Sequence, residues 1–292
     1  MTIGNPSSAH PVVLTAGPRT ITIESNPLIM GVLNVTPDSF SDGGTYVTIE
    51  QAVNHARQMQ AQGADIIDIG AESSRPGAQP IAESEELRRL IPVVEAVREA
   101  VSLPISVDTT KAVVARMAIQ AGAVIVNDIS ALQGDPLMAG LVAETGVAVV
   151  LMHMQGTPQT MQQSPQYDDV VDDICRFFEE RIRYATKMGI REDAIWLDPG
   201  FGFGKTSTHN LEILRRLAEF KKFGRPILIG TSNKFTIGAV LNLPVEERME
   251  GTAATVAVAI ANGADAVRVH DVKRMVRVAR MADAIVRGTF DE

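Results

Sequence analysis

The sequence has little cysteine, no long apolar run and no excess of positive charge, and each shortage excludes a class of protein. Cys175 is the one cysteine among 292 residues, so an internal disulfide is excluded, and packing inside a helix is the role we expect for its side chain. No stretch reaches the roughly 18 consecutive apolar residues that a membrane span needs. Met1–His10 lacks the basic segment and apolar run of a secretory signal. We therefore expect a cytoplasmic protein with no membrane partner.

The balance of charge argues against a nucleic-acid partner. The 27 Lys and Arg residues are outnumbered by 35 Asp and Glu residues, the formal net charge is −8, and the basic residues are scattered along the chain. Nucleic-acid-binding domains usually carry a basic patch or stripe instead. A small anionic ligand remains compatible with this composition, because a few cations close together suffice to bind it. Apolar residues make up 45% of the chain, which is enough for a large core.

What the sequence does contain is a repeated joint in which glycine stands between an amphipathic stretch and a β-branched run. Glycine adopts the left-handed conformation that ends a helix, after which the chain can enter a buried strand. The joints are Gly63-Ala64, Gly122-Ala123, Gly146-Val147, Gly189-Ile190 and Gly263-Ala264. Their recurrence predicts repeated αβ units.

Eight continuous apolar runs have the length of strands, and continuous rather than alternating runs are typical of parallel strands covered on both faces. They are residues 28–34, 65–69, 104–108, 124–127, 147–153, 194–198, 226–232 and 266–270. Helical patterns lie between them, for example Glu83–Ala100, Tyr167–Met188 and Glu246–Ala261. Eight strands alternating with helices predict an α/β fold, a TIM (β/α)8 barrel. A doubly wound open sheet is the alternative.

The first 25 residues do not fit this alternation. Val12–Thr15 and Thr20–Ile23, joined by a turn that contains Gly17 and Pro18, predict a short β-hairpin. We expect this hairpin, residues 1–25, to cover the amino-terminal mouth of a barrel domain formed by residues 26–292.

Each expected strand ends in a polar or charged residue. In chain order these are Asn34, Asp68, Asp108, Asn127, His153, Asp198, Ser232, and Arg268 with His270. In a (β/α)8 barrel the carboxyl ends of all strands meet at one mouth, where active sites lie. One cavity would then hold carboxylates, amides and cations, a set able to bind a hydrogen-bonding ring together with an anion.

Two loops after the first two strands are longer than a minimal connection. Asn34-Val-Thr-Pro-Asp-Ser-Phe-Ser-Asp-Gly-Gly44 and Gly70-Ala-Glu-Ser-Ser-Arg-Pro-Gly77 are rich in glycine, proline and hydroxyls, so we expect them to act as lids. A third loop, Leu-Asp-Pro-Gly-Phe-Gly-Phe-Gly-Lys-Thr at residues 197–206, superficially suggests a phosphate cradle. Pro199 stands where the nucleotide-binding pattern requires its first glycine. We interpret Lys205 in this loop as a solvated cation.

From about residue 28 to 285 the chain resembles the dihydropteroate synthase family. The resemblance rests on several long motifs in the family's order: Ile29-Met-Gly-Val-Leu-Asn-Val-Thr-Pro-Asp-Ser-Phe-Ser-Asp-Gly43, Asp68-Ile-Gly-Ala-Glu-Ser-Ser-Arg-Pro-Gly77, Val107-Asp-Thr109, Asn127-Asp-Ile129, Leu151-Met-His-Met-Gln-Gly156, residues 197–206 and Arg268-Val-His-Asp271. The resemblance implies condensation of 6-hydroxymethyl-7,8-dihydropterin pyrophosphate with p-aminobenzoate, assisted by Mg²⁺.

The resemblance also implies roles for individual residues. For the pterin it implies Asp108, Asp198 and Lys234 as catalytic residues, with Asn127, Met152 and Phe203 in the pocket. For the pyrophosphate it implies Arg268 and His270, with Asn34 holding Mg²⁺. Phe40, Ser74, Arg75 and Pro76 would enclose p-aminobenzoate and exclude water.

One stretch departs from the family's pattern. The family usually has Ser-Arg-Lys-Ser after the seventh strand, whereas this chain has Ser232-Asn233-Lys234-Phe235. The second serine is associated with the benzoate carboxylate at a helix N-terminus. Phe235 has no hydroxyl, which leaves backbone N–H groups to bind the anion. We therefore hypothesise unusual binding of p-aminobenzoate and sulfonamides.

Two alternatives to a synthase remain open at this point. One is a pterin-binding paralogue that has lost condensation, and the other is a methyltetrahydrofolate-dependent methyltransferase barrel. The resemblance also implies a homodimer formed through the last helices. Val256, Val258 and Ala259 are candidates for that interface, although they are equally compatible with the barrel core.

Overall fold

The structure, a computed structural model, describes residues 12–16, 19–23, 27–35 and 45–288. Eight parallel strands form one sheet with the order β8-β7-β6-β5-β4-β3-β10-β9. The strands are β3 (Leu28–Asn34), β4 (Ile66–Gly70), β5 (Ile105–Asp108), β6 (Ile125–Asp128), β7 (Ala148–Met152), β8 (Ile195–Asp198), β9 (Leu228–Ile229) and β10 (Ala266–Val269). A parallel bridge between Leu197 and Ile227 joins the two edges, so the sheet is closed. The predicted barrel is confirmed, and the open-sheet alternative is wrong.

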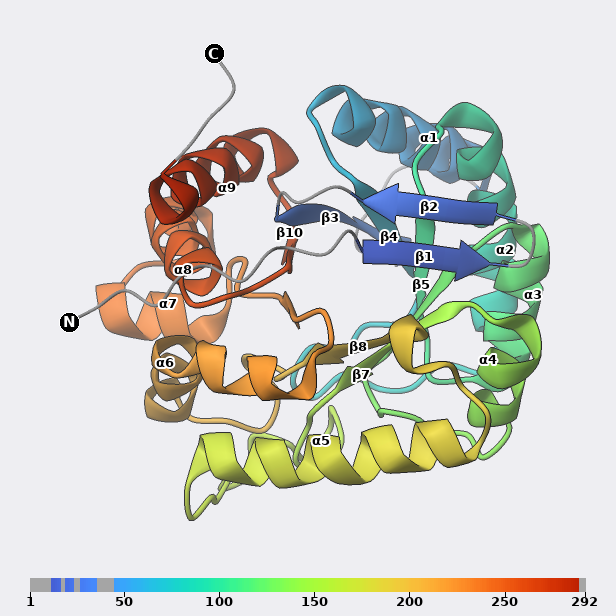
Figure 1. Cartoon of the computed structure of the whole chain (residues 1–292). Coiled ribbons are helices and arrows are strands. Elements are labelled where there is room, and N and C mark those ends of the chain that lie inside the picture. Colours follow the sequence, from blue (N-terminus) through green and yellow to red (C-terminus); the bar gives the residue numbers. More distant parts are fainter. Residues whose placement is uncertain (1–11, 17–18, 24–26, 36–44, 289–292) are drawn as a thin grey trace.

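The helices surround this barrel (Figure 1). They are α1 (Thr45–Ala61), α2 (Glu83–Ala100), α3 (Ala112–Ala121), α4 (Met138–Thr145), α5 (Val170–Lys187), α6 (Ser207–Arg215), α7 (Phe235–Leu241), α8 (Met249–Ala261) and α9 (Val272–Arg287), with the 3-10 turns η2 (Glu192–Ala194), η3 (Leu217–Phe223) and η4 (Val245–Glu247). All five glycines of the repeated joint have positive φ, between 67° at Gly146 and 117° at Gly122. The interpretation of these glycines as helix ends is confirmed.

The predicted strand 226–232 is the least accurate of the eight. Only Leu228–Ile229 pairs as a strand. Beyond Ile229 the side chains form hydrogen bonds, and the backbone pairing of the sheet does not continue. Thr255 donates to Thr231 at 2.9 Å between hydroxyls, and Ser232 Oγ lies 3.0 Å from Nδ1 of His270. The chain turns here before it enters α7.

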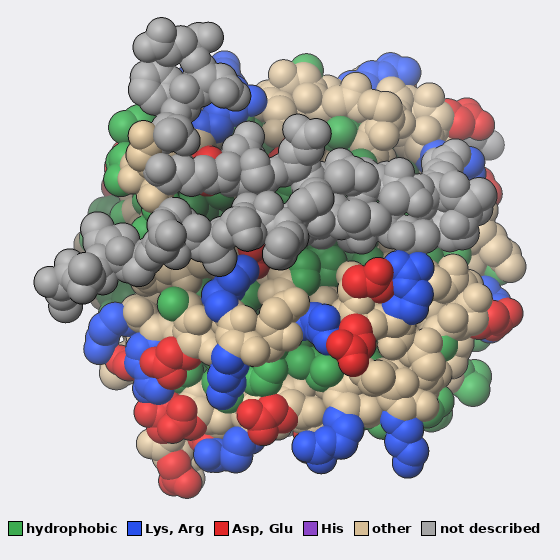
Figure 2. All heavy atoms as spheres, viewed as in Figure 1, with side chains coloured by type: hydrophobic (Ala, Val, Ile, Leu, Met, Phe, Trp, Pro, Cys, Tyr) green, Lys and Arg blue, Asp and Glu red, His purple; other side chains and the backbone are tan. Residues whose placement is uncertain are grey.

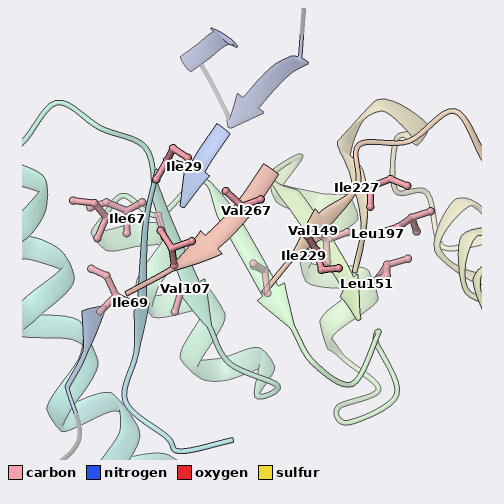
Figure 3. Packing of buried hydrophobic residues seen from close by; sticks show 14 of the residues in the cluster. Ile29, Ile67, Ile69, Val107, Val149, Leu151, Leu197, Ile227, Ile229 and Val267 are labelled. Atoms are coloured by element: carbon pink, nitrogen blue, oxygen red, sulfur yellow. The ribbon is translucent and has the colours of Figure 1, made fainter. Parts of the chain in front are cut away.

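The apolar core has two layers. The larger layer lies between the strands and the helices, and Figure 3 shows strand residues within it, among them Ile67, Val149 and Leu197. The smaller layer consists of Leu28, Met30, Ile66, Val124, Ile125, Ala148, Val150, Trp196, Leu228 and Ala266. Residues two apart on a strand share a face. On three strands an apolar residue of the smaller layer therefore shares its face with a polar residue two positions later. The pairs are Trp196 and Asp198, Ile66 and Asp68, and Ala266 and Arg268. The interior of the barrel is thus apolar, and it becomes polar toward the carboxyl ends of the strands.

The predicted hairpin is present as β1 (Val12–Ala16) and β2 (Arg19–Ile23), which pair antiparallel. Figure 1 shows both strands across one side of the barrel. β1 contacts β7 and η2, and η2 precedes β8, so the hairpin lies at the amino-terminal end of the strands. It is thereby kept away from the carboxyl-terminal mouth.

The exterior carries charges of both signs. In Figure 2, Lys and Arg side chains alternate with Asp and Glu side chains along the lower part of the molecule, where Figure 1 places α5. Cys175 lies within α5 and is buried, so its expected packing role is consistent with its position. No helix in the described part of the chain is long and apolar enough to cross a membrane.

Candidate active site

A half-buried arginine and three side chains from other strands of the barrel form the centre of the carboxyl-terminal mouth. Arg268 on β10 donates from Nε to Asp68 Oδ2 at 2.6 Å and from Nη2 to Asp108 Oδ2 at 2.9 Å. Asn127 on β6 donates from Nδ2 to the same Asp68 oxygen at 3.3 Å. The strand-end residues of β4, β5, β6 and β10 are therefore joined in one hydrogen-bonded set.

Asp68 is the member of this set to which the sequence assigned no role. Its side chain is fully buried, and Oδ1 has no hydrogen-bond partner among the described residues. A buried carboxylate is stable only when it is paired, and Arg268 supplies the pairing charge. Asp68 therefore holds Arg268 in place and brings negative charge close to Asp108.

Two carboxyl groups of the mouth, those of Asp108 and Asp198, have pKa values raised toward neutral pH. Burial raises the pKa of Asp108 to about 7; Arg268 opposes this rise, whereas Asp68 and Glu86 increase it. Burial also raises the pKa of Asp198 to about 6, against the Gly200 hydrogen bond and the charge of Lys234. Because desolvation penalises whichever form is charged, the same burial lowers the pKa of Lys234 to about 8.

Lys234, Phe203 and Asp198 face one another across the loop that follows β8. The Lys234 ammonium lies 4.1 Å from the centre of the Phe203 ring, which is a cation–π contact. Asp198 Oδ1 accepts from the backbone N–H of Gly200 at 2.7 Å. No bond from a described residue reaches the second oxygen of Asp198, so it remains available to a ligand.

Lys205 is not a solvated cation, and that interpretation was wrong. Its side chain is buried, and Nζ lies 2.9 Å from His153 Nδ1, 3.2 Å from His153 O and 2.9 Å from Phe203 O. Burial lowers the pKa of Lys205 to about 7. The cause is the loop glycines: a Cβ on Gly200, whose φ is 69°, would stand 1.9 Å from His153 O. The loop therefore packs tightly on the end of β7 and turns Lys205 inward.

A cavity of about 410 Å³ opens between the loops that follow β4, β5, β6 and β7. Asp108, Met152 and Ser74 line it, as does Ile129. Thr109, Glu86 and Glu72 also line it: Thr109 donates to Glu86 at 2.7 Å, and Lys111 bonds both Glu86 and Glu72. Sequence reasoning missed this ion-pair network, because Lys111 and the two glutamates have no distinctive spacing. Asn127, Asp198, Lys234 and Phe203 lie outside the cavity lining.

The loop after β4 is attached to the loop after β7. Gly77 N donates to Pro158 O at 2.9 Å, and the side chains of Gln159 and Gln79 are also 2.9 Å apart. Ser74 is half-buried, whereas Arg75 and Pro76 are exposed. Phe40, the counterpart expected on the other loop, lies outside the described residues.

The two residues expected to bind pyrophosphate, Arg268 and His270, lie in different surroundings. Arg268 is engaged with the carboxylates, whereas His270 lies beyond the end of β10 at the rim and pairs with Ser232. Asn34 ends β3 and is half-buried, and no hydrogen bond from its side chain to a described residue is present. No three His, Cys, Asp or Glu residues in the described ranges gather as a metal site.

The departure after the seventh strand has a distinct local geometry. Asn233 has φ of 57°, a left-handed conformation that asparagine tolerates better than arginine. Its backbone N–H donates to Thr252 Oγ1 at 3.2 Å, and its carbonyl accepts from Arg248 Nη1 at 3.0 Å. Phe235 is the first residue of α7, as expected, and 75% of its side chain is exposed.

The expected dimer residues do not share a surface. Val256 and Ala259 are buried in the barrel core, whereas Val258 is 46% exposed. The two buried positions are therefore excluded from an interface, because core packing already covers them.

A closed (β/α)8 barrel with paired carboxylates, an amide and cations converging at its carboxyl end defines an enzyme-type site for a polar ring. Residues 30–270 match the family described as pterin binding enzyme, and the chain belongs to that family.

Several curated proteins and solved structures similar to this chain are dihydropteroate synthases. Dihydropteroate synthase of Escherichia coli (strain K12) is 50% identical over 260 residues, covering 89% of this chain and 92% of that protein. Its counterpart from Bacillus subtilis is 47% identical over 274 residues, 94% of each. The structure of Yersinia pestis dihydropteroate synthase with a sulfonamide drug complex is 46% identical, has a TM-score of 0.89 and covers 95% of this chain and all of that one. That of Xanthomonas albilineans dihydropteroate synthase in complex with 7,8-dihydropteroate is 41% identical, with a TM-score of 0.84 and coverage of 94% and 98%.

Proposed function

We propose that this protein is a dihydropteroate synthase, a transferase that condenses 6-hydroxymethyl-7,8-dihydropterin pyrophosphate with p-aminobenzoate. The observation that carries the proposal is the convergence of Asp108, Asn127, Asp198, Lys234 and Arg268 at one barrel mouth, in a chain 50% identical to an enzyme of that name. These residues offer hydrogen bonds to a pterin edge and countercharge to a leaving anion.

The pterin would bind against Asp198, Asn127 and Lys234. The 2-amino group and a ring N–H of a pterin are adjacent donors, and an ionised carboxylate can accept both. The unpaired oxygen of Asp198 meets this need in part, since Gly200 already occupies Oδ1. Lys234 is held over Phe203, and a ring stacked near Phe203 would bring its acceptors within reach of that ammonium. Met152, which is buried, would form an apolar wall.

Asp108 would act where positive charge develops. In the condensation the C–O bond to the pyrophosphate breaks, its electron pair leaves with that oxygen, and the pterin methylene becomes cationic. The amine nitrogen of p-aminobenzoate then forms the C–N bond and loses a proton. An ionised Asp108 close to the methylene stabilises the cation electrostatically. Arg268 is bonded to Asp108 and would attract the departing anion.

The pyrophosphate would lie at Asn34, Arg268 and His270, with Mg²⁺ as the accompanying cation. Mg²⁺ commonly keeps several waters and binds through one or two protein oxygens plus phosphate oxygens. The single amide oxygen of Asn34, which no described residue engages, fits that donor set. When bound, the metal supplies charge neutralisation for the leaving pyrophosphate. Ser74, Arg75 and Pro76, with Phe40, would enclose p-aminobenzoate and exclude water from the cation.

The decisive experiment is a pyrophosphate-release assay with the purified protein and both substrates. The proposal expects release that depends on p-aminobenzoate and yields 7,8-dihydropteroate. Pterin binding without release would identify a pterin-binding paralogue instead. Methyl transfer from methyltetrahydrofolate without release would identify a methyltransferase.

We also propose a cytoplasmic homodimer. Cys175 is buried and unpaired, in accord with a reducing compartment. Exposed apolar side chains lie on α7, α8 and α9, and α8 packs against both α7 and α9 at one edge of the barrel (Figure 1): Val240, Leu241, Val258, Met281 and Ile285. An exposed apolar surface of this kind is typical of a subunit interface.

A further inference from the structure

A second hollow lies outside the mouth, between α1 and the first turns of α9. Its volume is about 570 Å³, and its lining is His55, Gln58, Gln62, His270, Asp271, Lys273, Arg274 and Arg277. No apolar side chain is among these lining residues. A hollow lined only by polar and charged residues favours a polar ligand over a pterin or a benzoate ring.

The charge of this groove is opposite to that of the whole chain. Lys273, Arg274 and Arg277 against the single carboxylate of Asp271 give the lining a formal charge of +2 with both histidines neutral, whereas the chain as a whole carries −8. A local potential of opposite sign concentrates counter-ions at such a surface. The lining therefore selects an anion.

Asp271 does not cancel this preference. Its Oδ1 accepts from the backbone N–H of Arg274 at 2.9 Å and its Oδ2 from Arg274 Nη1 at 3.1 Å, so the carboxylate is engaged at the start of α9. Lys273 and Arg277 are exposed, and no ion pair joins either of them to another described residue. Two cations one helical turn apart are thus left for a ligand.

His270 lines the groove and directly follows β10, the strand that carries Arg268. His270 Nδ1 is paired with Ser232 Oγ at 3.0 Å, which leaves Nε2 as the ring nitrogen available to a ligand. Arg268 lies two residues earlier on β10. An anion at the rim is therefore within a short distance of both the Arg268 site and the groove.

We infer that the groove between α1 and α9 is a binding site for inorganic pyrophosphate or a related diphosphate group, held by Lys273 and Arg277 with His270 at its end nearest Arg268. In the reaction it receives the pyrophosphate that leaves Arg268 and prevents its return. That role rests on the proposed function, whereas the affinity of the groove for pyrophosphate does not.

The test is calorimetric titration of the purified protein with sodium pyrophosphate in the presence of EDTA. EDTA removes divalent cations and so prevents metal-assisted binding of pyrophosphate. The double variant Lys273→Ala/Arg277→Ala is compared with Arg183→Ala/Lys187→Ala. The control pair also removes one arginine and one lysine four residues apart, on the exposed face of α5. The inference expects roughly tenfold weaker binding in the groove variant, as for lost charge-assisted hydrogen bonds, and wild-type affinity in the control.

Equal affinity in all three proteins, or no binding by the wild type at millimolar pyrophosphate, would overturn the inference. Binding should also weaken between 50 mM and 500 mM salt, because exposed cations are screened. A protein that fails the release assay but passes this titration would refute the proposed function and leave the groove intact. In an active enzyme, the groove variant should show weaker product inhibition by pyrophosphate with an unchanged KM for p-aminobenzoate.

Discussion

Nζ of Lys205 lies 2.9 Å from Nδ1 of His153, and both side chains are buried without a carboxylate contact among the described residues. The three atoms around Nζ are the His153 nitrogen and the carbonyl oxygens of His153 and Phe203. A neutral amine can donate to both carbonyls and accept from the Nδ1–H tautomer of neutral His153, so this environment accommodates uncharged lysine. Through these bonds the loop that carries Phe203 is held to the end of β7.

The first prediction concerns the pH dependence of stability. The pKa of Lys205 is lowered to about 7 from 10.5, so between these values the unfolded chain holds a proton that the folded chain does not. The free energy of unfolding then rises with pH in this window, by up to about 1.4 kcal/mol per unit. In Lys205→Met this contribution is absent. Urea unfolding from pH 7.5 to 9 should show the wild type gaining stability relative to the variant. Lys187→Met, an exposed lysine on α5, should keep the wild-type slope, and a parallel slope in Lys205→Met would contradict the assignment.

The second prediction concerns the acid limb of the reaction. Asp108, with a pKa near 7, must be ionised to stabilise a cation, so kcat/KM should fall as the pH drops through about 7. Asp68→Asn removes a neighbouring negative charge, so that Asp108 becomes the only carboxylate paired with Arg268 in this set. The midpoint of the pH profile should therefore move down by about one pH unit. Profiles of kcat/KM between pH 5 and 8 measure this. Glu144→Gln, an exposed site on α4, should leave the midpoint in place, and an unmoved midpoint in Asp68→Asn would count against coupling of the two carboxylates.

The third prediction concerns recognition of the pterin edge. Asp198→Asn keeps the shape of the side chain but presents an amide where paired acceptors are required. The affinity for the dihydropterin substrate should fall by about 100-fold, in line with about 3 kcal/mol for a lost charge-assisted pair. Equilibrium binding of the pterin, measured without p-aminobenzoate, isolates this effect. Because Gly200 still finds an acceptor at residue 198, the thermal midpoint should change little; retained pterin affinity would exclude Asp198 from recognition.

The fourth prediction concerns Phe235, which occupies the position where the family has serine. Its ring is 75% exposed, so Phe235→Ser should change the free energy of unfolding by less than about 0.5 kcal/mol. The new hydroxyl should lower the KM for p-aminobenzoate and shift the Ki for sulfonamides by roughly threefold or more, as one added hydrogen bond allows. Steady-state kinetics with both ligands measure this, with Phe235→Ala separating the hydroxyl from the loss of the ring. Unchanged constants in Phe235→Ser would sink the hypothesis.

The fifth prediction concerns the subunit interface. Met281→Glu places a charge in the exposed apolar surface on α9, where Met281 is 62% exposed. Light scattering after gel filtration should show a dimer for the wild type and a monomer for the variant, because a buried unpaired charge costs several kcal/mol. Leu137→Glu, 67% exposed but distant at the start of α4, is the matched control and should remain dimeric. A monomeric wild type would refute the homodimer.

Much of the fold was predictable because its signals are local. Continuous apolar runs marked seven strands to within one residue at each end, and glycines that require positive φ marked the helix ends. The strand-end position of Asp108, Asn127, Asp198 and Arg268 placed them at one mouth, since parallel strands of a barrel share their carboxyl end.

The errors arose where the answer depends on a partner far away in the sequence. α8 is apolar nearly all round, so its periodicity did not reveal that Val256 and Ala259 face the core while Val258 faces outward. Lys205 follows three glycines in what reads as an exposed loop, but its surroundings are set by His153, 52 residues earlier.

By itself the sequence determined the barrel, the side of the barrel on which the chemistry lies and the residue types available there, because these follow from strand periodicity, glycine conformation and motif order. Only the tertiary structure decided which charges meet. Asp68 and Arg268, 200 residues apart, are brought to 2.6 Å by pairing of β3 with both β4 and β10. Burial at that meeting point, which no local pattern encodes, raises the pKa of Asp108 to about 7, and burial of Lys205 against His153 lowers its pKa to about 7.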